Sequence, residues 1–471
     1  MKLLPGMLLV GAVLTACVSA PTITPAESRL ASGNLGLGDT KTPAISDTWW
    51  HAFGDVQLDS LIDQALHGSP TLAAALARMR QAQAELSMSR AVSYPQVSVD
   101  GQETRQRFSE NYIIPPPFGG STDWIGTAQA KLDWSLDFWG KQSAMVAMAQ
   151  RSAEAAELDM AAARLALAGV LTQTYIDLAR SCALRDLAAA TVKQRASILE
   201  LTNTRVRNGL ESTTAQKNAE VLLALARADR IRADSNLELT RHQIAALIGR
   251  GADVYATIRE PGLNLDVIPL PPVLPADLLA RRADIQAARA RIDAALSGRD
   301  VARKAFYPDM NIAAFAGWSS IGLDQMFSAS ARTYGAGPAI HLPVFDAGEL
   351  RAQYAGATAA LDAAVADYNG AVIDAVKQTA DTLTQLRTLQ EQAAEQGIAL
   401  DAARESFRLA EIRYRNGIDA QLNVLDAETT LLEAERRSTS LHADIKSQRV
   451  ALLMAFGGGF ELADPLQENT Q

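Results

Sequence analysis

The chain has 471 residues, a formal net charge of −9 at pH 7 and 48% hydrophobic residues. No apolar run approaches the ~18 residues that cross a bilayer as a helix. A mildly acidic chain without a basic stripe gives no electrostatic reason to expect nucleic-acid binding. The length would fit roughly two to four ordinary domains, so the order of the elements must decide the architecture.

The N-terminus has the features of a secretory signal. Lys2 precedes an apolar stretch at residues 3–14, and small residues follow. The stretch ends in Leu-Thr-Ala-Cys at 14–17, which resembles the bacterial lipobox, where the cysteine is lipidated and becomes the mature N-terminus. An accidental cysteine beside an ordinary signal peptide is the alternative. Because Cys17 stands at the end of the apolar core, we expect a signal at 1–16 and a covalent diacylglycerol and N-acyl chain on Cys17.

Residues 17–44 are rich in Pro, Thr, Ser and Gly, a composition typical of an extended tether between lipid and fold. Val18 follows the cysteine, and lipoproteins retained at the inner membrane usually have Asp there, so Val18 favours the outer membrane. The only other cysteine, Cys182, is expected to be a small packed helix residue. The five histidines have no ligand spacing, and we expect no metal site.

The first folded elements are expected to be helices. Apolar residues at 58, 61, 62, 65 and 66 share one helical face. A second helical pattern runs from Thr71 to about Ala91, and Pro70 suits its start. Tyr94-Pro95 ends it, because proline disfavours helix in the residue before it. Trp49 and Trp50, just upstream, are better explained as packing residues than as a ligand site.

Two segments with period-2 alternation follow, on either side of a Pro- and Gly-rich loop at 109–120. Val97 and Val99 alternate with polar residues in the first segment, and residues 128–135 alternate in the second. They predict a β-hairpin at about 94–135. One polar and one apolar face suit a barrel wall with a wet interior and a lipid-facing exterior.

A long proline-free stretch begins after this hairpin. Residues 141–207 would form one helix of roughly 100 Å at ~1.5 Å per residue, which indicates a coiled coil. Asn208-Gly209 ends it, since glycine accepts the left-handed conformation of a helix end. Ser212 is placed to cap the next helix, which returns to about Gly249.

The same order of elements then restarts after a proline-rich connector at 261–276. A helix ends at Tyr307-Pro308, candidate strands occupy about 308–342, and a second helical hairpin spans about 346–457. Identical residues recur 208 positions apart, among them Arg205/Arg413, Arg207/Arg415, Asn208/Asn416, Gly209/Gly417, Glu220/Glu428 and Arg241/Arg449. We therefore predict a duplication: repeat 1 at 45–260, repeat 2 at 277–460, and a tail at 461–471.

Four strands cannot close a barrel, and open sheet edges are not tolerated in lipid. Other copies of the chain must complete the sheet, and a symmetric ring is the simplest solution. Three chains would give twelve strands, an even number within the usual range. We expect a mainly α protein with a transmembrane β-barrel, in which a trimer forms a 12-stranded β-barrel continued by a 12-helix periplasmic α-barrel.

In these features the chain resembles the TolC-like outer-membrane efflux family, and within it the lipoprotein branch of OprM- or NodT-like factors. The residues that carry the resemblance are the lipobox, 49–62, 274–285 and both Arg-x-Arg-Asn-Gly turns. It implies a homotrimer in the outer membrane that passively exports drugs or other small toxic compounds. An inner-membrane RND-type pump would deliver them through a periplasmic membrane-fusion adaptor. A duct for type I protein secretion and a periplasmic coiled-coil scaffold remain alternatives, and no cofactor or catalytic set is expected.

The resemblance also implies that the hairpin tips are the closed periplasmic end and the adaptor-docking surface. These tip residues are Asn208, Gly209, Leu210, Asn416, Gly417 and Ile418. Four tip cations, Arg205, Arg207, Arg413 and Arg415, would stabilise helix C-termini or pair across chains. Four tryptophans flank the candidate strands and could form an aromatic belt: Trp124, Trp134, Trp139 and Trp318.

Three polar residues beyond the second turn predict a gate. Asp419, Asn423 and Asp426 are spaced i, i+4, i+7 and would share a helix face. In a trimer Asp426 would supply three carboxylates, a ring that selects cations. Family members often carry aspartates at the positions of both Asn423 and Asp426, so this ring would be less charged. The alternative is that the two acids only complement the helix dipole, which fits Asp419 better than Asp426.

Overall fold

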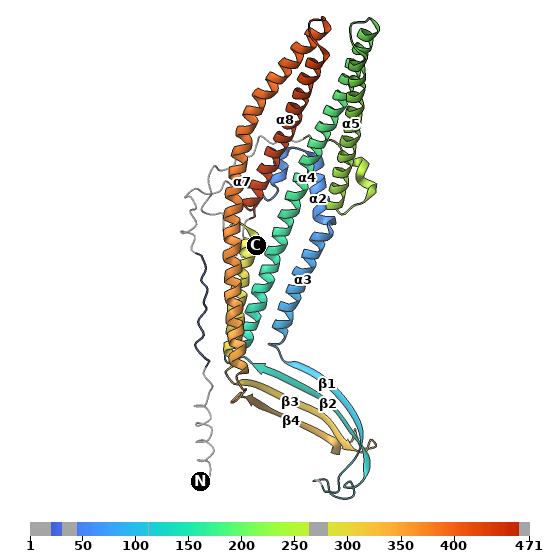
Figure 1. The fold of residues 1–471 in the computed structure, drawn as a ribbon. Helices are drawn as coiled ribbons and strands as arrows, with labels where there is room; N and C mark the ends of the chain where they lie inside the picture. The colour runs from blue at the N-terminus through green and yellow to red at the C-terminus, as the bar shows by residue number, and fades with distance from the viewer. Residues whose placement is uncertain (1–19, 31–44, 112, 263–280, 461–471) are drawn as a thin grey trace. The chain divides into compact units, whose positions relative to one another are not determined.

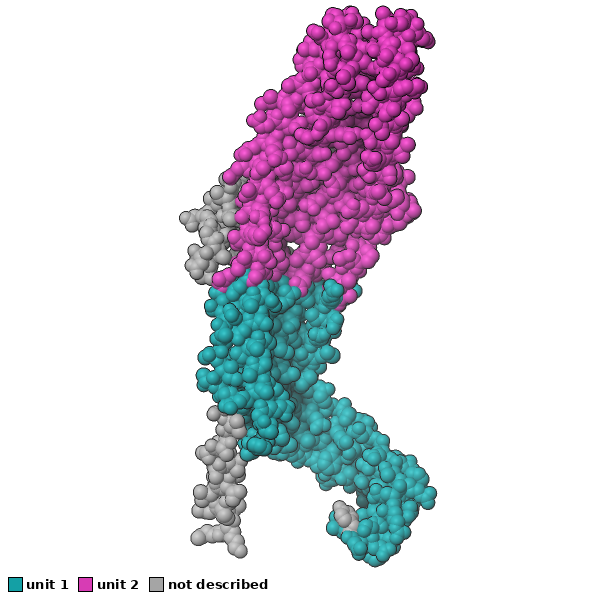
Figure 2. Space-filling model, in the orientation of Figure 1, with its two compact units in different colours: residues 1–29, 78–157, 287–369 teal, residues 30–77, 158–286, 370–471 magenta. Residues whose placement is uncertain are grey.

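A computed structural model of the chain describes residues 20–30, 45–111, 113–262 and 281–460 (Figure 1). The predicted signal, Cys17, most of the tether and connector, and the tail at 461–471 lie outside the described residues. The chain divides into two compact units, coloured in Figure 2. Unit 1 comprises 1–29, 78–157 and 287–369, and unit 2 comprises 30–77, 158–286 and 370–471. Each unit takes segments from both repeats, and the predicted repeat bounds stay a prediction.

Unit 1 contains a four-stranded antiparallel sheet in the order β1-β2-β3-β4. The strands are β1 (Gln96–Arg107), β2 (Thr122–Leu136), β3 (Asp309–Ile321) and β4 (Arg332–His341). The two strand pairs come from the two repeats, and they join where β2 pairs with β3 (Figure 1). Within the described chain β1 and β4 each have a partner on one side only, so the sheet has two open edges.

The register gives the middle of this sheet one mainly apolar and one mainly polar face. Cross-strand partners point to the same side of a sheet. One such row contains Val99, Ala130, Ala316 and Tyr334. The neighbouring row on the opposite face contains Asp100, Gln129, Gly317 and Thr333. Lys131 and Asp100 form an ion pair of 3.3 Å on that polar face.

The long helices have the bounds α3 (Pro70–Ala91), α4 (Lys141–Arg207), α5 (Thr213–Leu247), α6 (Ala283–Lys304), α7 (Glu349–Arg415) and α8 (Gln421–Ala455). None of the helices in the described segments is both long and apolar enough to cross a membrane. In unit 1, α6 packs on the beginning of α7 through Ile292, Leu361 and Val365.

Unit 2 has its main core around the 3₁₀ helix η3 (Trp49–Phe53) and α2 (Val56–Gly68). Trp49 and Trp50 are buried there, which agrees with the packing role expected for them. Asp55 caps α2, and its Oδ2 accepts hydrogen bonds from Tyr175 Oη (2.9 Å) and Gly262 N (2.8 Å). Burial raises the pKa of the Tyr175 hydroxyl. The short helix η4 (Ala252–Thr257) follows α5.

Candidate functional site: the hairpin tips of unit 2

The two hairpin turns have the same backbone. Gly209 N donates to Val206 O and Leu210 N to Arg205 O, at 3.0 and 2.8 Å. The second turn repeats this pattern from Gly417 and Ile418 at 3.0 and 2.9 Å. This is the Schellman arrangement of a helix end, and both glycines have positive φ, +69° and +74°. Ser212 caps α5 through Ala215 N, as predicted.

A seam joins the two hairpins through Tyr414. Arg205 Nη1 donates to Tyr414 O at 3.1 Å, and its guanidinium lies 4.6 Å from the Tyr414 ring centroid. Gln421 Nε2 donates to Thr202 Oγ1 at 2.7 Å, and both side chains are buried. Ile198, Tyr414, Val424 and Leu425 form the apolar part of the contact. Arg205 therefore joins the two hairpins of one chain through a carbonyl and a ring, and its Nε also lies 3.9 Å from Glu211 Oε2 of its own hairpin.

A buried ion pair lies further along the same seam. Arg195 Nε is 3.5 Å from Glu428 Oε2, and the Glu428 side chain is fully buried. Neither carboxylate oxygen accepts a hydrogen bond from the described residues. Burial raises the pKa of Glu428, and the charge of Arg195 opposes that rise. A desolvated, incompletely satisfied carboxylate of this kind depends on its single partner.

The predicted gate residues separate into two groups. Asp419 precedes α8 and is tied to the turn: Arg413 Nε lies 3.2 Å from its Oδ2, and the Asn423 amide donates to its Oδ1. The hydrogen bond from Asn423 is the largest cause that lowers the pKa of Asp419. Asp426 is exposed, and its carboxylate has no hydrogen-bond or ion-pair partner among the described residues. The structure thus brings Asn423 to Asp419 and leaves Asp426 unpaired.

The other tip residues make local contacts or none. Arg207 Nη2 donates to Thr204 Oγ1 at 3.1 Å, and Arg415 pairs with Glu411 at 2.7 Å. Asn416 Nδ2 donates to Ile412 O at 2.8 Å. Leu210 and Ile418 stand at equivalent places in the two turns and are 65% and 66% exposed. The two turns therefore present a large apolar side chain to solvent at the same point of each repeat.

The comparisons with known proteins identify the family. The model of the outer membrane efflux protein family matches residues 61–250 and again 274–458. The chain belongs to the outer membrane efflux protein family. It is 32% identical over 471 residues to the multidrug resistance outer membrane protein MdtP of Escherichia coli, covering 98% of this chain and 96% of that one. It is 33% identical to the fusaric acid resistance protein FusA of Burkholderia cepacia over 75% of this chain and 68% of that one.

A solved structure shows the same fold. The outer membrane protein VceC of Vibrio cholerae is similar with a TM-score of 0.82 and 34% identity, over 88% of this chain and 100% of VceC. The predicted family resemblance, the fold class and the outer-membrane location are thereby confirmed. An outer membrane efflux protein works as a conduit. Its functional residues are therefore those that join the helices of its wall, close its end or contact another protein.

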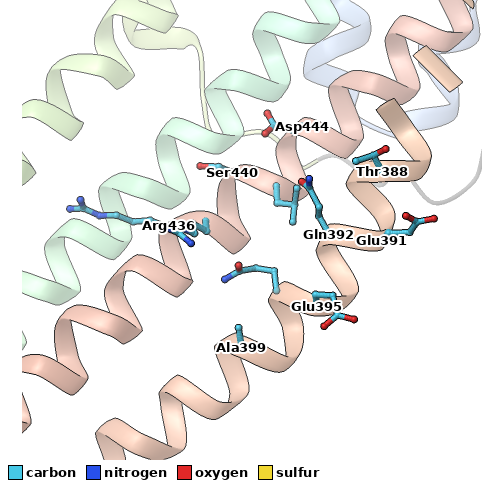
Figure 3. A pocket seen from close by; sticks show the side chains of 11 residues that line it. Thr388, Glu391, Gln392, Glu395, Ala399, Arg436, Ser440 and Asp444 are labelled. Carbon is cyan, nitrogen blue, oxygen red and sulfur yellow. The ribbon is translucent and has the colours of Figure 1, made fainter. Parts of the chain in front are cut away.

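This efflux protein also has a groove between α7 and α8, of about 960 Å³, in unit 2 (Figure 3). Thr388, Gln392 and Glu395 line it from α7, and Arg436 and Asp444 from α8. Three charged residues of α8 line the groove, and each has an ion-pair partner. Arg436 lies 3.4 Å from Asp229 and Asp444 lies 2.6 Å from Arg180, whereas Arg437 pairs with Glu433 of its own helix. The groove is open and lies between two packed helices, and Arg436 and Asp444 pair across to the other hairpin. We interpret it as a helix-packing feature rather than a substrate pocket.

Sequence reasoning missed the seam of this efflux protein. The sequence analysis assigns no role to Tyr414, Arg195 or Glu428, although Tyr414 lies inside the repeated turn and Glu428 matches Glu220. One signal was available: the position 208 residues after Arg195 is Ala403, and Val206 corresponds to Tyr414. Differences between otherwise matching repeats mark the places where the two hairpins have different neighbours.

Proposed function

We propose that this chain is the outer-membrane exit duct of a tripartite efflux pump, and that it passively exports drugs or other small toxic compounds. The two-faced sheet with open edges β1 and β4 is the observation that carries the proposal. An apolar face suits lipid and a polar face suits a water-filled lumen. MdtP and FusA are named for resistance to small compounds, which favours the same cargo over secreted proteins.

The functional unit is a homotrimer. A four-stranded sheet must be completed by other copies because unpaired strand edges are not stable in lipid. Three copies supply twelve strands, with β1 of one copy beside β4 of the next. Exposed apolar residues on the outer helices, such as Leu225 of α5 and Ile398 of α7, fit contacts between copies. Cys17 carries the acyl chains, and Cys17→Ala is expected to abolish incorporation of labelled palmitate.

Two partners complete the pump. An inner-membrane RND-type transporter delivers the cargo, and a periplasmic membrane-fusion adaptor docks on the tips. The exposed side chains of Leu210 and Ile418 give that docking an apolar anchor at equivalent places of both hairpins. Crosslinking from cysteines placed at these two positions should capture the adaptor in cells. Capture from Ile231, equally exposed on α5 but far along the helix from the turn, serves as the control.

Deleting the gene tests the function in the cell. The deletion strain should become more susceptible to several small toxic compounds, and the intact gene supplied in trans should restore resistance. If susceptibility is unchanged and the strain instead fails to secrete a protein, the chain is a duct for protein secretion and the proposal of drug export is wrong.

Asp426 is the gate carboxylate of this duct. It is exposed and unpaired within the described chain, so its charge is free to act on ions in the lumen. In planar bilayers, Asp426→Ala should raise the conductance of a mostly closed pore and reduce its preference for cations. Asn218→Ala, at the equivalent place of repeat 1, is the matched control and should leave both unchanged. If Asp426→Ala and wild type have the same conductance and the same cation preference, Asp426 is not the gate residue.

A further inference from the structure

The mainly apolar face of the sheet ends in arginines. Every second residue of a strand lies on the same face, and this face contains Val99 of β1 and Tyr334 of β4. Arg105 and Arg107, at the end of β1, lie on it by this spacing, and so does Arg332, the first residue of β4. We call these three the rim arginines, and the four described strands contain no other arginine. The apolar face thus becomes basic at one end.

The basic end of the sheet is the end away from the helices. α3 and α6 lead into the beginnings of β1 and β3, and α4 and α7 follow the ends of β2 and β4. The opposite end carries the loops that join β1 to β2 and β3 to β4, and the rim arginines lie there. The proposed function puts the helices in the periplasm. On that proposal, the basic end lies in the outer leaflet of the outer membrane.

Tryptophans stand opposite two of the rim arginines. Arg105 pairs in register with Trp124 of β2, and its guanidinium lies 5.8 Å from the centroid of the Trp124 ring. Arg332 pairs in register with Trp318 of β3. The two tryptophans are 41% and 36% exposed. Tryptophan is enriched where a membrane meets water, so these pairs mark the level at which the apolar face leaves the hydrocarbon.

Most acidic residues of the strands lie on the other face. Glu103, two residues before Arg105, is the one acid of the described strands on the apolar face. Glu110 of the following loop lies 3.3 Å from Arg107. Arg105 and Arg332 form no ion pair with a described residue, so their charges are not neutralised within the chain. The polar face holds all four strand aspartates: Asp100, Asp123, Asp133 and Asp309.

The rim arginines also lie on the two open edges of the sheet, β1 and β4. In the proposed trimer, β1 of one copy lies beside β4 of the next. Each strand runs opposite to its neighbour, so the end of β1 comes beside the beginning of β4. Arg105 and Arg107 of one copy then approach Arg332 of the next. β4 contains no acidic residue that could neutralise this boundary.

We propose that the rim arginines of two adjacent copies bind phosphate groups of lipopolysaccharide, the phosphorylated lipid of the outer leaflet, at each boundary of the trimer. A guanidinium donates two parallel hydrogen bonds to a phosphate and complements its charge. The arginine stem covers apolar surface while its charged end reaches the headgroups. A lipid held by two copies binds the closed ring and not the single chain, so it stabilises the trimer. This inference rests on the proposed trimer and on the proposed contact of the apolar face with lipid.

Native mass spectrometry of the delipidated full-length protein tests the binding. The probe is diphosphoryl lipid A, the membrane anchor of lipopolysaccharide, and the measured mass gives the number of chains and the number of bound lipids separately. Wild type should be a trimer with one lipid A at each boundary. It should bind lipid A without phosphates about ten-fold more weakly or less. A different number of chains would contradict the proposed trimer. A trimer that binds both lipids equally would overturn the lipid site alone.

Charge variants locate the site. Arg105 and Arg332 are exposed, so Arg105→Gln and Arg332→Gln should fold, and each should raise the Kd for diphosphoryl lipid A roughly ten-fold. Arg105→Lys should have a smaller effect, because it keeps the charge and loses the parallel hydrogen bonds. Lys131→Gln removes the one strand lysine, which lies on the polar face, and as the matched control should leave the Kd unchanged. Equal weakening by Lys131→Gln would show that net charge, and not the rim, holds the lipid.

Crosslinking tests the meeting of the two edges without lipid. Arg107→Cys combined with Arg332→Cys should be joined between copies by a reagent that spans about 10 Å, roughly two strand spacings. In the control, Arg107→Cys is combined with Ile340→Cys, whose cysteine lies eight residues, or about 27 Å, further along β4 and should give no product. Cys182 is buried, and Cys17 is common to both variants. Equal product from the two pairs, or none from either, would refute the convergence of the rim arginines.

Discussion

The two hairpin turns of unit 2 have nearly the same backbone and very different side-chain surroundings. Both end a 67-residue helix with the same pair of hydrogen bonds and a left-handed glycine. The turn of repeat 2 places Tyr414 in the buried seam, where repeat 1 has Val206. Glu428 is fully buried beside Arg195, whereas its counterpart Glu220 is 41% exposed and pairs with Lys217.

After the duplication, both copies kept the backbone path of the turn, because short local signals in the sequence set that path. The side chains that meet another hairpin diverged, because each copy has different neighbours on its two sides. The contacts of the tip seam join α4 to the end of α7 and the beginning of α8. Further along the hairpins, α8 also pairs with α4 through Asp444 and Arg180, and with α5 through Arg436 and Asp229.

Removing Arg195 should show the largest difference between the repeats. Arg195→Ala leaves the Glu428 carboxylate buried and unpaired, and breaking a buried pair in this way costs about 3–5 kcal/mol of unfolding free energy. Lys217→Ala, which breaks the exposed pair with Glu220, should cost no more than about 0.5 kcal/mol. Urea unfolding followed by helical circular dichroism measures both. Similar losses in the two variants would mean that the seam is not a buried interface.

The two equivalent tip arginines should differ next. Arg205→Ala loses the hydrogen bond to Tyr414 O and the contact with its ring, and we expect a loss of about 1–2 kcal/mol. Arg413 is 56% exposed and pairs with Asp419, so Arg413→Ala should cost less than about 1 kcal/mol. Tyr414→Leu removes the ring but keeps the carbonyl, so it should reduce the effect of Arg205→Ala without abolishing it. Thermal unfolding of each variant measures these losses. A double-mutant cycle of Arg205→Ala and Tyr414→Leu gives the coupling energy between the two side chains.

Substitution of the two turn glycines, Gly209 and Gly417, should lower stability by the same amount. An added Cβ would meet no atom within 4 Å at Gly209 or Gly417, so only the positive φ resists substitution. Gly209→Ala and Gly417→Ala should each cost about 1 kcal/mol. Equal melting temperatures of the two variants would support a shared backbone device. A clearly larger loss at one glycine would show that the two turns are not equivalent.

The smallest expected effect is on the pH dependence of stability. We expect it from Glu428 of repeat 2 and not from Glu220 of repeat 1. Burial raises the pKa of Glu428 above its usual 4.5, so the native state binds its proton more readily than the unfolded chain. The contribution of this group to stability is therefore greatest at low pH and falls as pH rises from about 4.5 through the raised native pKa. Glu428→Gln should remove that component from the plot of melting temperature against pH. Glu220→Gln should leave the plot unchanged.

Local signals made the long helices, the turns and the strands predictable. The absence of proline from 141–207 marked a long helix, and the structure has α4 over the same residues. Alternation marked β1 and β2, because one face of each strand meets lipid and the other meets water. The burial of Glu428 could not be predicted, since Glu220 and Glu428 are identical in sequence and differ only in what lies beside them. The hydrogen bonds that Arg299, Asp362 and Asn369 make with residues 23–28 left no signal either, because they involve main-chain atoms of that segment.

The open edges of β1 and β4 have a consequence for assembly. A single newly exported chain carries two unpaired strands and an apolar sheet face, which invite pairing with any exposed strand. Correct closure needs three chains to meet, so its rate rises steeply with local concentration. An acyl anchor confines the chains to one surface and so raises their effective concentration by restricting the search to two dimensions. On the proposed lipidation, Cys17 thus promotes correct trimer closure over edge-to-edge aggregation in the periplasm.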